Sequence, residues 1–185
     1  MAHSLTEVLT WIARIEAGTP LYNVDFGPDS LPAESGILLD RVSFTKGCYL
    51  GQEIVARMHA RGHPKQQLVA LRPLAPATSP ALTPEDLATA ALHQPVAGAH
   101  LFRPESETPA DVTPKGDPVG AITSSTISPM LGSQVIALAQ LKHDLCYPGT
   151  QLLAQTPAGL LRMVVQPTLT SWSSLPRISD QGGLH

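Results

Sequence analysis

Charge of one sign is scarce in this chain of 185 residues, and so are charged residues in general. They make up 15% of the sequence, with 12 lysines and arginines against 15 acids and a formal net charge of -3. Surfaces that bind nucleic acid or anionic lipid need clustered lysine and arginine, so we expect no direct nucleic-acid binding. No apolar run reaches the roughly 18 residues of a membrane span, and we expect no membrane partner.

Cysteine is also scarce, with only Cys48 and Cys146, which lie far apart in different settings. Two thiols and no Cys-x-x-Cys pair exclude a four-thiolate zinc or iron–sulfur site built by this chain alone. The first residues show no basic stretch followed by an apolar run, so no secretory signal is predicted. We therefore expect a soluble, cytoplasmic protein with free thiols, in which Cys146 is a small apolar filler of a turn.

The sequence divides into stretches that differ in charge, proline content and apolar content. Residues 1–72 carry mixed charge and the most distinctive motifs. Residues 73–118 hold nine of the 18 prolines, and the stretch up to 169 consists of short apolar runs separated by glycine and proline. This pattern predicts an α+β protein with one domain at 1–72, a second at 73–169 and a frayed tail at 170–185.

Helices and strands are predicted from the spacing of apolar residues. Near the N-terminus, after a cap at Ser4 or Thr6, apolar residues recur at helical spacing: Leu5, Val8, Leu9, Ile12 and Ile15. Further helices are expected at 52–60 and after Thr83. Six strands are expected, at 66–71, 95–102, 118–124, 134–141, 150–155 and 160–166. Short strands with regular turns suit a small antiparallel barrel or a sandwich.

The segment most suggestive of chemistry surrounds Cys48. This cysteine stands two residues after Lys46 and three before Gly51, where a helix is expected to begin. The amides at the helix start and the lysine charge both favour the thiolate over the thiol. A reactive thiol presented from a loop is one interpretation, and a structural cysteine buried in a glycine-rich turn is the other. His59 and His63 lie nearby, but Gly62 separates them, so we expect no metal site.

At this segment the sequence resembles a known family. The octapeptide Lys46-Gly47-Cys48-Tyr49-Leu50-Gly51-Gln52-Glu53 is similar to the signature of the YgfZ-type folate-binding proteins, relatives of the glycine-cleavage T-protein, an aminomethyltransferase. Other stretches resemble both branches: Arg14-Ile15-Glu16-Ala17-Gly18, Leu31-Pro32-Ala33-Glu34, Gly120-Ala121-Ile122-Thr123-Ser124 and Ser128-Pro129. The resemblance runs from about residue 10 to about residue 166. It implies a remnant of the folate-binding α/β region followed by a small antiparallel C-terminal β-barrel.

The resemblance also implies a function. Proteins of the YgfZ branch bind tetrahydrofolate and support the assembly or repair of iron–sulfur proteins and, through them, tRNA modification. Glu34 is then the carboxylate that holds the pterin, with Tyr22 as a neighbour and Arg61 as a further folate contact. Cys48 and Lys46 form the reactive pair. Without the resemblance, Glu34 would be an ordinary acid in a surface loop.

The chain departs from the family pattern at its N-terminus. Full-length relatives carry a substantial region before the helix of Arg14, which supplies one wall of the folate cavity and the aspartate of the T-protein. We therefore expect an incomplete transferase, partnered by iron–sulfur proteins or their assembly machinery, that forms a homo-oligomer or binds a complementary N-terminal chain. The alternatives are a tetrahydrofolate-dependent one-carbon transferase and a thiol redox interaction module.

Overall fold

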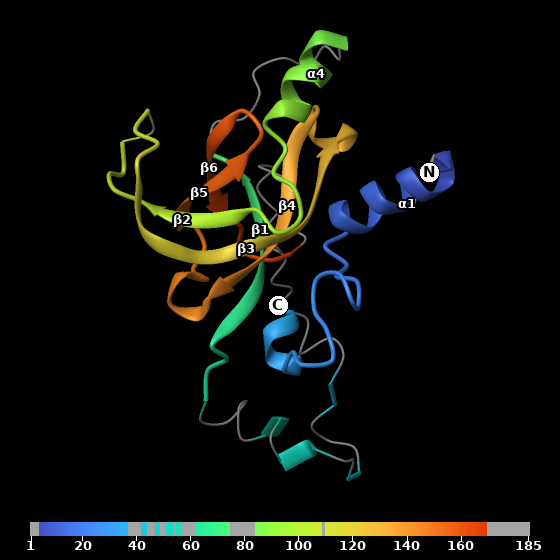
Figure 1. Ribbon diagram of the computed structural model, residues 1–185. Helices are drawn as coiled ribbons and strands as arrows, with labels where there is room; N and C mark the ends of the chain where they lie inside the picture. The colour runs from blue at the N-terminus through green and yellow to red at the C-terminus, as the bar shows by residue number, and fades with distance from the viewer. Residues whose placement is uncertain are drawn as a thin grey trace, which may run out of the picture.

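The centre of the protein is a closed antiparallel barrel. The structure, a computed structural model, describes residues 4–36, 42–43, 47–48, 51–53, 55–56, 62–74, 84–108 and 110–169. Six strands close the barrel in the order β1-β4-β3-β2-β5-β6 (Figure 1). Their bounds are β1 (Gln66–Pro73), β2 (His100–Pro104), β3 (Pro114–Ser128), β4 (Gln134–Lys142), β5 (Gln151–Thr156) and β6 (Gly159–Val165). Of the two predicted architectures, the barrel is confirmed.

Every second residue of several strands points into the barrel. Val69 and Leu71 of β1 share this buried core with Met163 and Val165 of β6. This alternation is the period of two that predicted the strands. Because β1 pairs with both β4 and β6, the barrel begins at Gln66. The boundary expected at residue 72 therefore falls inside β1, because the change in proline content marks the connection after this strand and not the start of the barrel.

Two strands differ in extent from the prediction. β2 begins at His100, because the residues before it form a turn in which the amide of Gly98 bonds to the carbonyl of Ile122 at 2.8 Å. β3 continues beyond both predicted ends, and its pairing with β4 shifts register between Ile122 and Ser124. Such a β-bulge lets a long strand bend with the barrel and remain paired.

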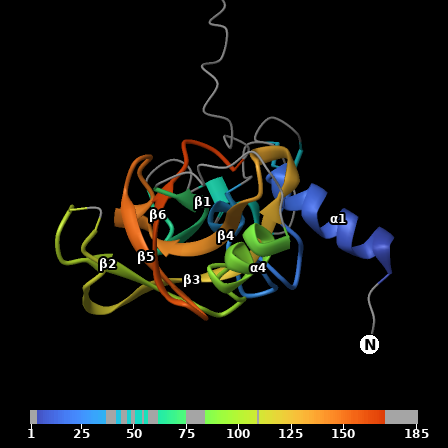
Figure 2. The same ribbon diagram turned by 90° about the horizontal axis from the view of Figure 1, so that it is seen from above.

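The N-terminal helix α1 (Leu5–Glu16) forms as predicted, but its apolar face is not buried. Ser4 caps the helix, and its hydroxyl accepts from the amide of Glu7 at 3.2 Å. Ile15 is the buried residue of the helix, whereas Leu5 is 75% and Leu9 is 56% exposed. Figure 2 shows the N-terminal end of α1 projecting away from the barrel, and the helix contacts the strands from Trp11 onward.

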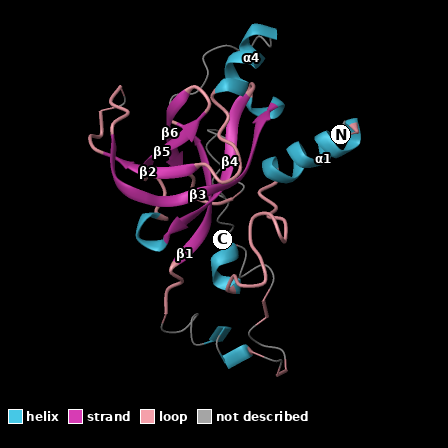
Figure 3. Cartoon of the chain, in the orientation of Figure 1, coloured by secondary structure: helices cyan, strands magenta, loops and turns pink. Residues whose placement is uncertain are grey.

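The remaining helices are short (Figure 3). They are α4 (Pro84–Leu92) and the 3-10 turns η1 (Pro32–Ser35), η2 (Pro129–Leu131) and η3 (His143–Leu145). Of the helix predicted at 52–60, residues 52, 53, 55 and 56 are helical, and the others lie outside the described residues, as do Thr83 and the tail at 170–185. In the described part of the chain, no helix has the length and apolar character needed to cross a membrane.

A second apolar cluster joins the N-terminal segment to the outside of the barrel. Ile15 of α1 and Leu169 pack with outward-facing residues of two neighbouring strands, Leu68 and Ala70 of β1 and Ile136 and Leu138 of β4. β1 and β4 are therefore apolar on both faces. This contact places the segment that carries Tyr22 and Glu34 against the barrel wall.

Gly120 provides a test of the β3–β4 packing. A Cβ at this position would meet the carbonyl oxygen of Gln140 and lie 3.1 Å from the Cα of Leu141. We expect Gly120→Ala to lower the free energy of unfolding by about 1–3 kcal/mol, because the backbone of β4 must shift. Urea denaturation followed by circular dichroism measures the loss. Gly27→Ala, at a position with no heavy atom within 4 Å, is the matched control, and an equal loss in both variants would contradict the explanation.

Candidate functional site

Cys48 is exposed, and its sulfur is free. The described neighbours fit a presented loop, because a Cβ added to Gly47 would meet nothing within 4 Å, and Gly51 has a φ of +85° that favours glycine. The next residues, Gln52 and Glu53, are helical, so a helix starts where the sequence predicted one. A cysteine buried in a glycine-rich turn does not describe this site. Lys46 and Tyr49 lie outside the described residues, and the chemistry of the thiol stays a prediction.

Glu34 is buried, with 7% of its surface exposed, and belongs to a small self-closed turn. Its Oε2 accepts a hydrogen bond from the amide of Leu31 at 3.0 Å, and its own amide donates to the carbonyl of Leu31 at 2.8 Å. Among the described residues, the other carboxylate oxygen has no hydrogen-bond partner. A Cβ at Gly36 would lie 2.8 Å from the carbonyl oxygen of Leu68, so glycine lets this turn pack closely on β1.

Tyr22 lies in a neighbouring turn and is 54% exposed. Its ring meets that of Phe26 edge to face, with centroids 5.8 Å apart. No hydrogen bond, ion pair or ring contact joins Tyr22, Glu34 and Cys48 in the described part of the chain. Arg61 lies outside the described residues. The roles expected of these residues in folate binding stay predictions.

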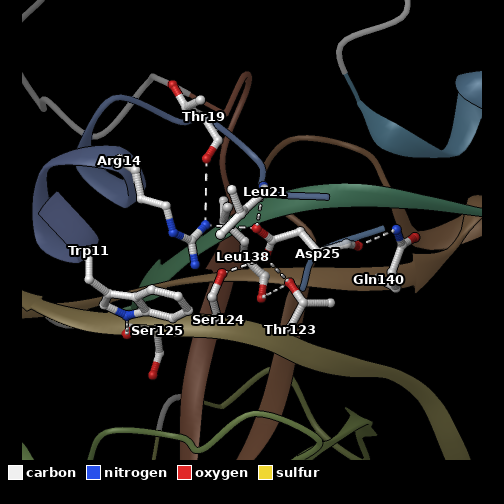
Figure 4. A network of polar contacts seen from close by, with 10 residues as sticks. All are labelled: Trp11, Arg14, Thr19, Leu21, Asp25, Thr123, Ser124, Ser125, Leu138 and Gln140. Atoms are coloured by element: carbon white, nitrogen blue, oxygen red, sulfur yellow. Dashed lines mark hydrogen bonds and ion pairs between the residues drawn. The ribbon is translucent and has the colours of Figure 1, made fainter. Parts of the chain in front are cut away.

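The turn of Tyr22 is held by a buried carboxylate, Asp25 (Figure 4). Its Oδ2 is 2.7 Å from Nη1 of Arg14 and accepts from the amide of Leu21 at 2.9 Å. Its Oδ1 accepts from the hydroxyls of Thr123 and Ser124, both at 2.5 Å. One side chain therefore joins α1, the turn after it and strand β3.

The β-bulge in β3 explains how two consecutive hydroxyls reach one carboxylate. Successive side chains of a regular strand point to opposite faces, so Thr123 and Ser124 would ordinarily diverge. The register shift between Ile122 and Ser124 removes this alternation locally. Both hydroxyls can then face Asp25 on the outside of the barrel.

Two further residues of α1, Trp11 and Glu16, reinforce its attachment to the barrel. The indole nitrogen of Trp11 donates to the carbonyl of Ser125 at 3.2 Å, and the Arg14 guanidinium lies 3.9 Å from the centroid of the Trp11 ring. A carboxylate oxygen of Glu16 accepts from the hydroxyl of Ser128 and, at 3.4 Å, from the amide of Met130. The stretches Arg14–Gly18, 120–124 and Ser128–Pro129 therefore meet in space, and several of their polar residues bond the N-terminal segment to the barrel.

Sequence reasoning singled out these stretches but missed what joins them. Asp25 carries no local signal, because its partners on β3 lie 98 and 99 residues away. Gln140, whose amide nitrogen donates to the carbonyls of Asp25 and Glu34, was missed as well. A search for polar residues on the outward face of an apolar strand would have found Gln140.

Cys146 differs from Cys48 in environment. It is half-buried against the barrel core, as expected for a small apolar filler, and burial raises the pKa of its thiol to about 11. The thiol is therefore protonated at neutral pH. Over the residues that the structure describes, no three histidine, cysteine or acidic side chains gather as a metal site would require.

A solved structure of another protein has a similar architecture. A crystal structure of the glycine cleavage system aminomethyltransferase T from Bartonella henselae is similar, with a TM-score of 0.59 and 23% identity, and covers 83% of this chain and 35% of that chain. The fold is therefore of the aminomethyltransferase T class. No protein-family model matches the chain.

Two relatives are similar to part of this chain in sequence. The tRNA-modifying protein YgfZ of Yersinia enterocolitica is 45% identical over 60 residues, which are 31% of this chain and 18% of that protein. The mitochondrial iron–sulfur cluster assembly factor IBA57 of Homo sapiens is 45% identical over 56 residues, 30% of this chain and 16% of that protein. Over these residues the chain is similar to YgfZ-type proteins, and its fold is similar to part of an aminomethyltransferase T structure. The matches span less than a fifth of the length of these two relatives.

The Asp25 network yields a second prediction. Asp25→Asn removes the charge that neutralises Arg14 in a buried site and should lower the free energy of unfolding by about 3–5 kcal/mol. Chemical denaturation of the purified variant measures the change. The exposed pair Arg103–Asp144, 2.6 Å apart, supplies the control, because Asp144→Asn should cost less than about 1 kcal/mol. Similar losses of unfolding free energy in the two variants would mean that the buried Asp25 carboxylate stabilises the fold no more than an exposed ion pair does.

Proposed function

We propose that this chain is a folate-binding accessory factor for the assembly or repair of iron–sulfur proteins and, through them, for tRNA modification. The observation that carries the proposal is the pairing of a YgfZ-type sequence with the T-protein fold. The names of two relatives, one tRNA-modifying and one an iron–sulfur cluster assembly factor, point to the same kind of client. The proposed setting is the cytoplasm, and the proposed cofactor is tetrahydrofolate.

Glu34 is the proposed anchor of the pterin. The amino-pyrimidinone edge of a pterin presents neighbouring N–H donors, and a carboxylate accepts such a pair. Oε2 of Glu34 uses one of its acceptor positions on Leu31, and the second oxygen has no partner among the described residues. Tyr22 offers an exposed ring in the adjoining turn, on which a flat heterocycle can stack. These features fit the ligand, with Arg61 as the third proposed contact.

Cys48 is the proposed reactive group. Its exposure leaves the sulfur accessible to a client protein or to an electrophile, and the helix that starts after Gly51 places backbone amides a few residues away. Lys46 is proposed to assist it by its charge. A thiol presented from a loop suits direct contact with an iron–sulfur client protein.

The chain matches only a small part of the length of its relatives. The proposal therefore includes a partner that completes the binding site. We propose that residues before β1 are the remnant of a larger folate-binding α/β region. The apolar side chains of Leu5 and Leu9 on α1 and of Tyr22 in the turn after it are exposed, and they are the surface proposed for a partner. A complementary N-terminal chain or a second copy would cover this surface and enclose the ligand.

A second candidate, a tetrahydrofolate-dependent one-carbon transferase, is supported by the fold alone. It requires folate-dependent turnover of an aminomethyl donor by the purified chain. A thiol redox interaction module is the third candidate and requires oxidant-dependent partner binding that Cys48→Ser abolishes. Tight folate binding without turnover would favour the accessory factor over both alternatives.

Calorimetric titration with tetrahydrofolate tests the ligand. The wild-type chain should bind, and Glu34→Gln should weaken binding by about 10- to 100-fold, because a charge-assisted pair of hydrogen bonds is lost. Glutamine retains an oxygen for the amide of Leu31, so the turn is preserved. Glu105→Gln, on an exposed loop of the barrel, is the control and should bind like wild type. Absence of heat and of thermal stabilisation with the wild-type chain would reject the folate proposal.

Selective alkylation tests the two thiols. At pH 8 the thiolate fraction of Cys146 is about one in a thousand, because its pKa is about 11, and its sulfur is half-buried. Iodoacetamide should therefore label the native chain at Cys48, and Cys48→Ser should remain nearly unlabelled until guanidinium unfolds it. Peptide mass spectrometry reads the sites. Equal labelling of both cysteines in the native chain would contradict the assignment of Cys48 as the accessible thiol.

A further inference from the structure

Two short turns carry the proposed folate contacts, and each is closed by its own hydrogen bonds. In the first, the amide of Asp25 donates to the carbonyl of Leu21 at 2.9 Å, and the amide of Asn23 donates to the carbonyl of Phe26 at 2.7 Å. In the second, Glu34 bonds to Leu31 through both its backbone and its side chain. Each turn therefore keeps its internal shape without the other.

One side chain bonds to both turns. Gln140 lies on the outer face of β4, between Leu68 of β1 and Ala121 of β3. Its Nε2 donates to the carbonyl of Asp25 at 3.1 Å and to the carbonyl of Glu34 at 3.4 Å. The carbonyls accept and cannot donate, so the NH2 group must face the turns and Oε1 must face away from them.

The orientation leaves Gln140 with a buried, unpaired acceptor. Oε1 is shielded from solvent and has no hydrogen-bond partner among the described residues. A buried acceptor without a partner is unfavourable. The unpaired oxygen is therefore a cost that accompanies the bridging of the two turns. Because Oε1 is shielded, Gln140 does not touch a ligand.

We propose that Gln140 is a positioning residue, which fixes the distance between the Tyr22 turn and the Glu34 turn so that one pterin can contact both. This inference rests on the proposed folate site. A flat ligand that stacks on Tyr22 and bonds to Glu34 tolerates only a small change in their separation. The amide of Gln140 joins the backbone of the first turn directly to that of the second.

Gln140→Met separates positioning from stability. Methionine has a length similar to that of glutamine. It removes the hydrogen bonds that Nε2 donates, which lowers the free energy of unfolding, and it removes the unpaired acceptor Oε1, which raises it. The two effects oppose each other. We expect the melting temperature to change by no more than about 3 °C and the affinity for tetrahydrofolate to fall about tenfold. Gln155→Met, at an exposed position on β5, is the matched control and should change neither quantity.

A double-mutant cycle identifies the mechanism. In a Tyr22→Ala background the ligand no longer needs both turns, so adding Gln140→Met should weaken binding by less than about twofold. An equal loss of affinity with and without Tyr22, together with a large fall in melting temperature, would show that Gln140 is merely structural. Binding that Glu34→Gln weakens but Gln140→Met does not would overturn this inference alone. No binding by the wild-type chain would overturn the proposed function as well.

Discussion

The buried carboxylate of Asp25 is the interaction on which the arrangement of the chain depends. It accepts from the guanidinium of Arg14, from the amide of Leu21 and from two hydroxyls of β3. A buried charge is costly unless it is paired and hydrogen-bonded, and here all of these partners point at one group. The N-terminal segment therefore has a single defined docking position on the barrel, which apolar contact by Ile15 alone would not specify.

Position on the barrel determines what the candidate site can do. Glu34 and Tyr22 lie on turns that have few apolar anchors of their own, and the barrel holds them through Asp25, Gln140 and the close approach of Gly36 to β1. A rigid scaffold that carries functional groups on short loops is a common design for binding sites. The stretches Arg14–Gly18, 120–124 and Ser128–Pro129 serve partly in this attachment, so resemblance to a motif does not by itself make a residue a ligand contact.

The sequence allowed the barrel to be predicted more fully than the site. Strands such as β4 and β6 alternate or concentrate apolar residues between glycine and proline signals, and this local pattern is enough to locate them. The helix α1 was predicted with its cap, but its surroundings could not be, because a helical stripe such as Leu5 and Leu9 indicates an apolar face and not whether anything covers it. Asp25 and Gln140 were missed because their roles arise from contacts between residues distant in the chain.

Closure of the barrel by pairing β1 with β6 also affects the order in which the protein can fold. Leu71 of β1 pairs with Val165 of β6, so the wall cannot close until β6 has been synthesised. The segment bearing Asp25 and Glu34 precedes β1 and must wait for its partners on β3 and β4 before it can dock. The turns of the candidate site are therefore synthesised before the strands that hold them and can be assembled only afterwards.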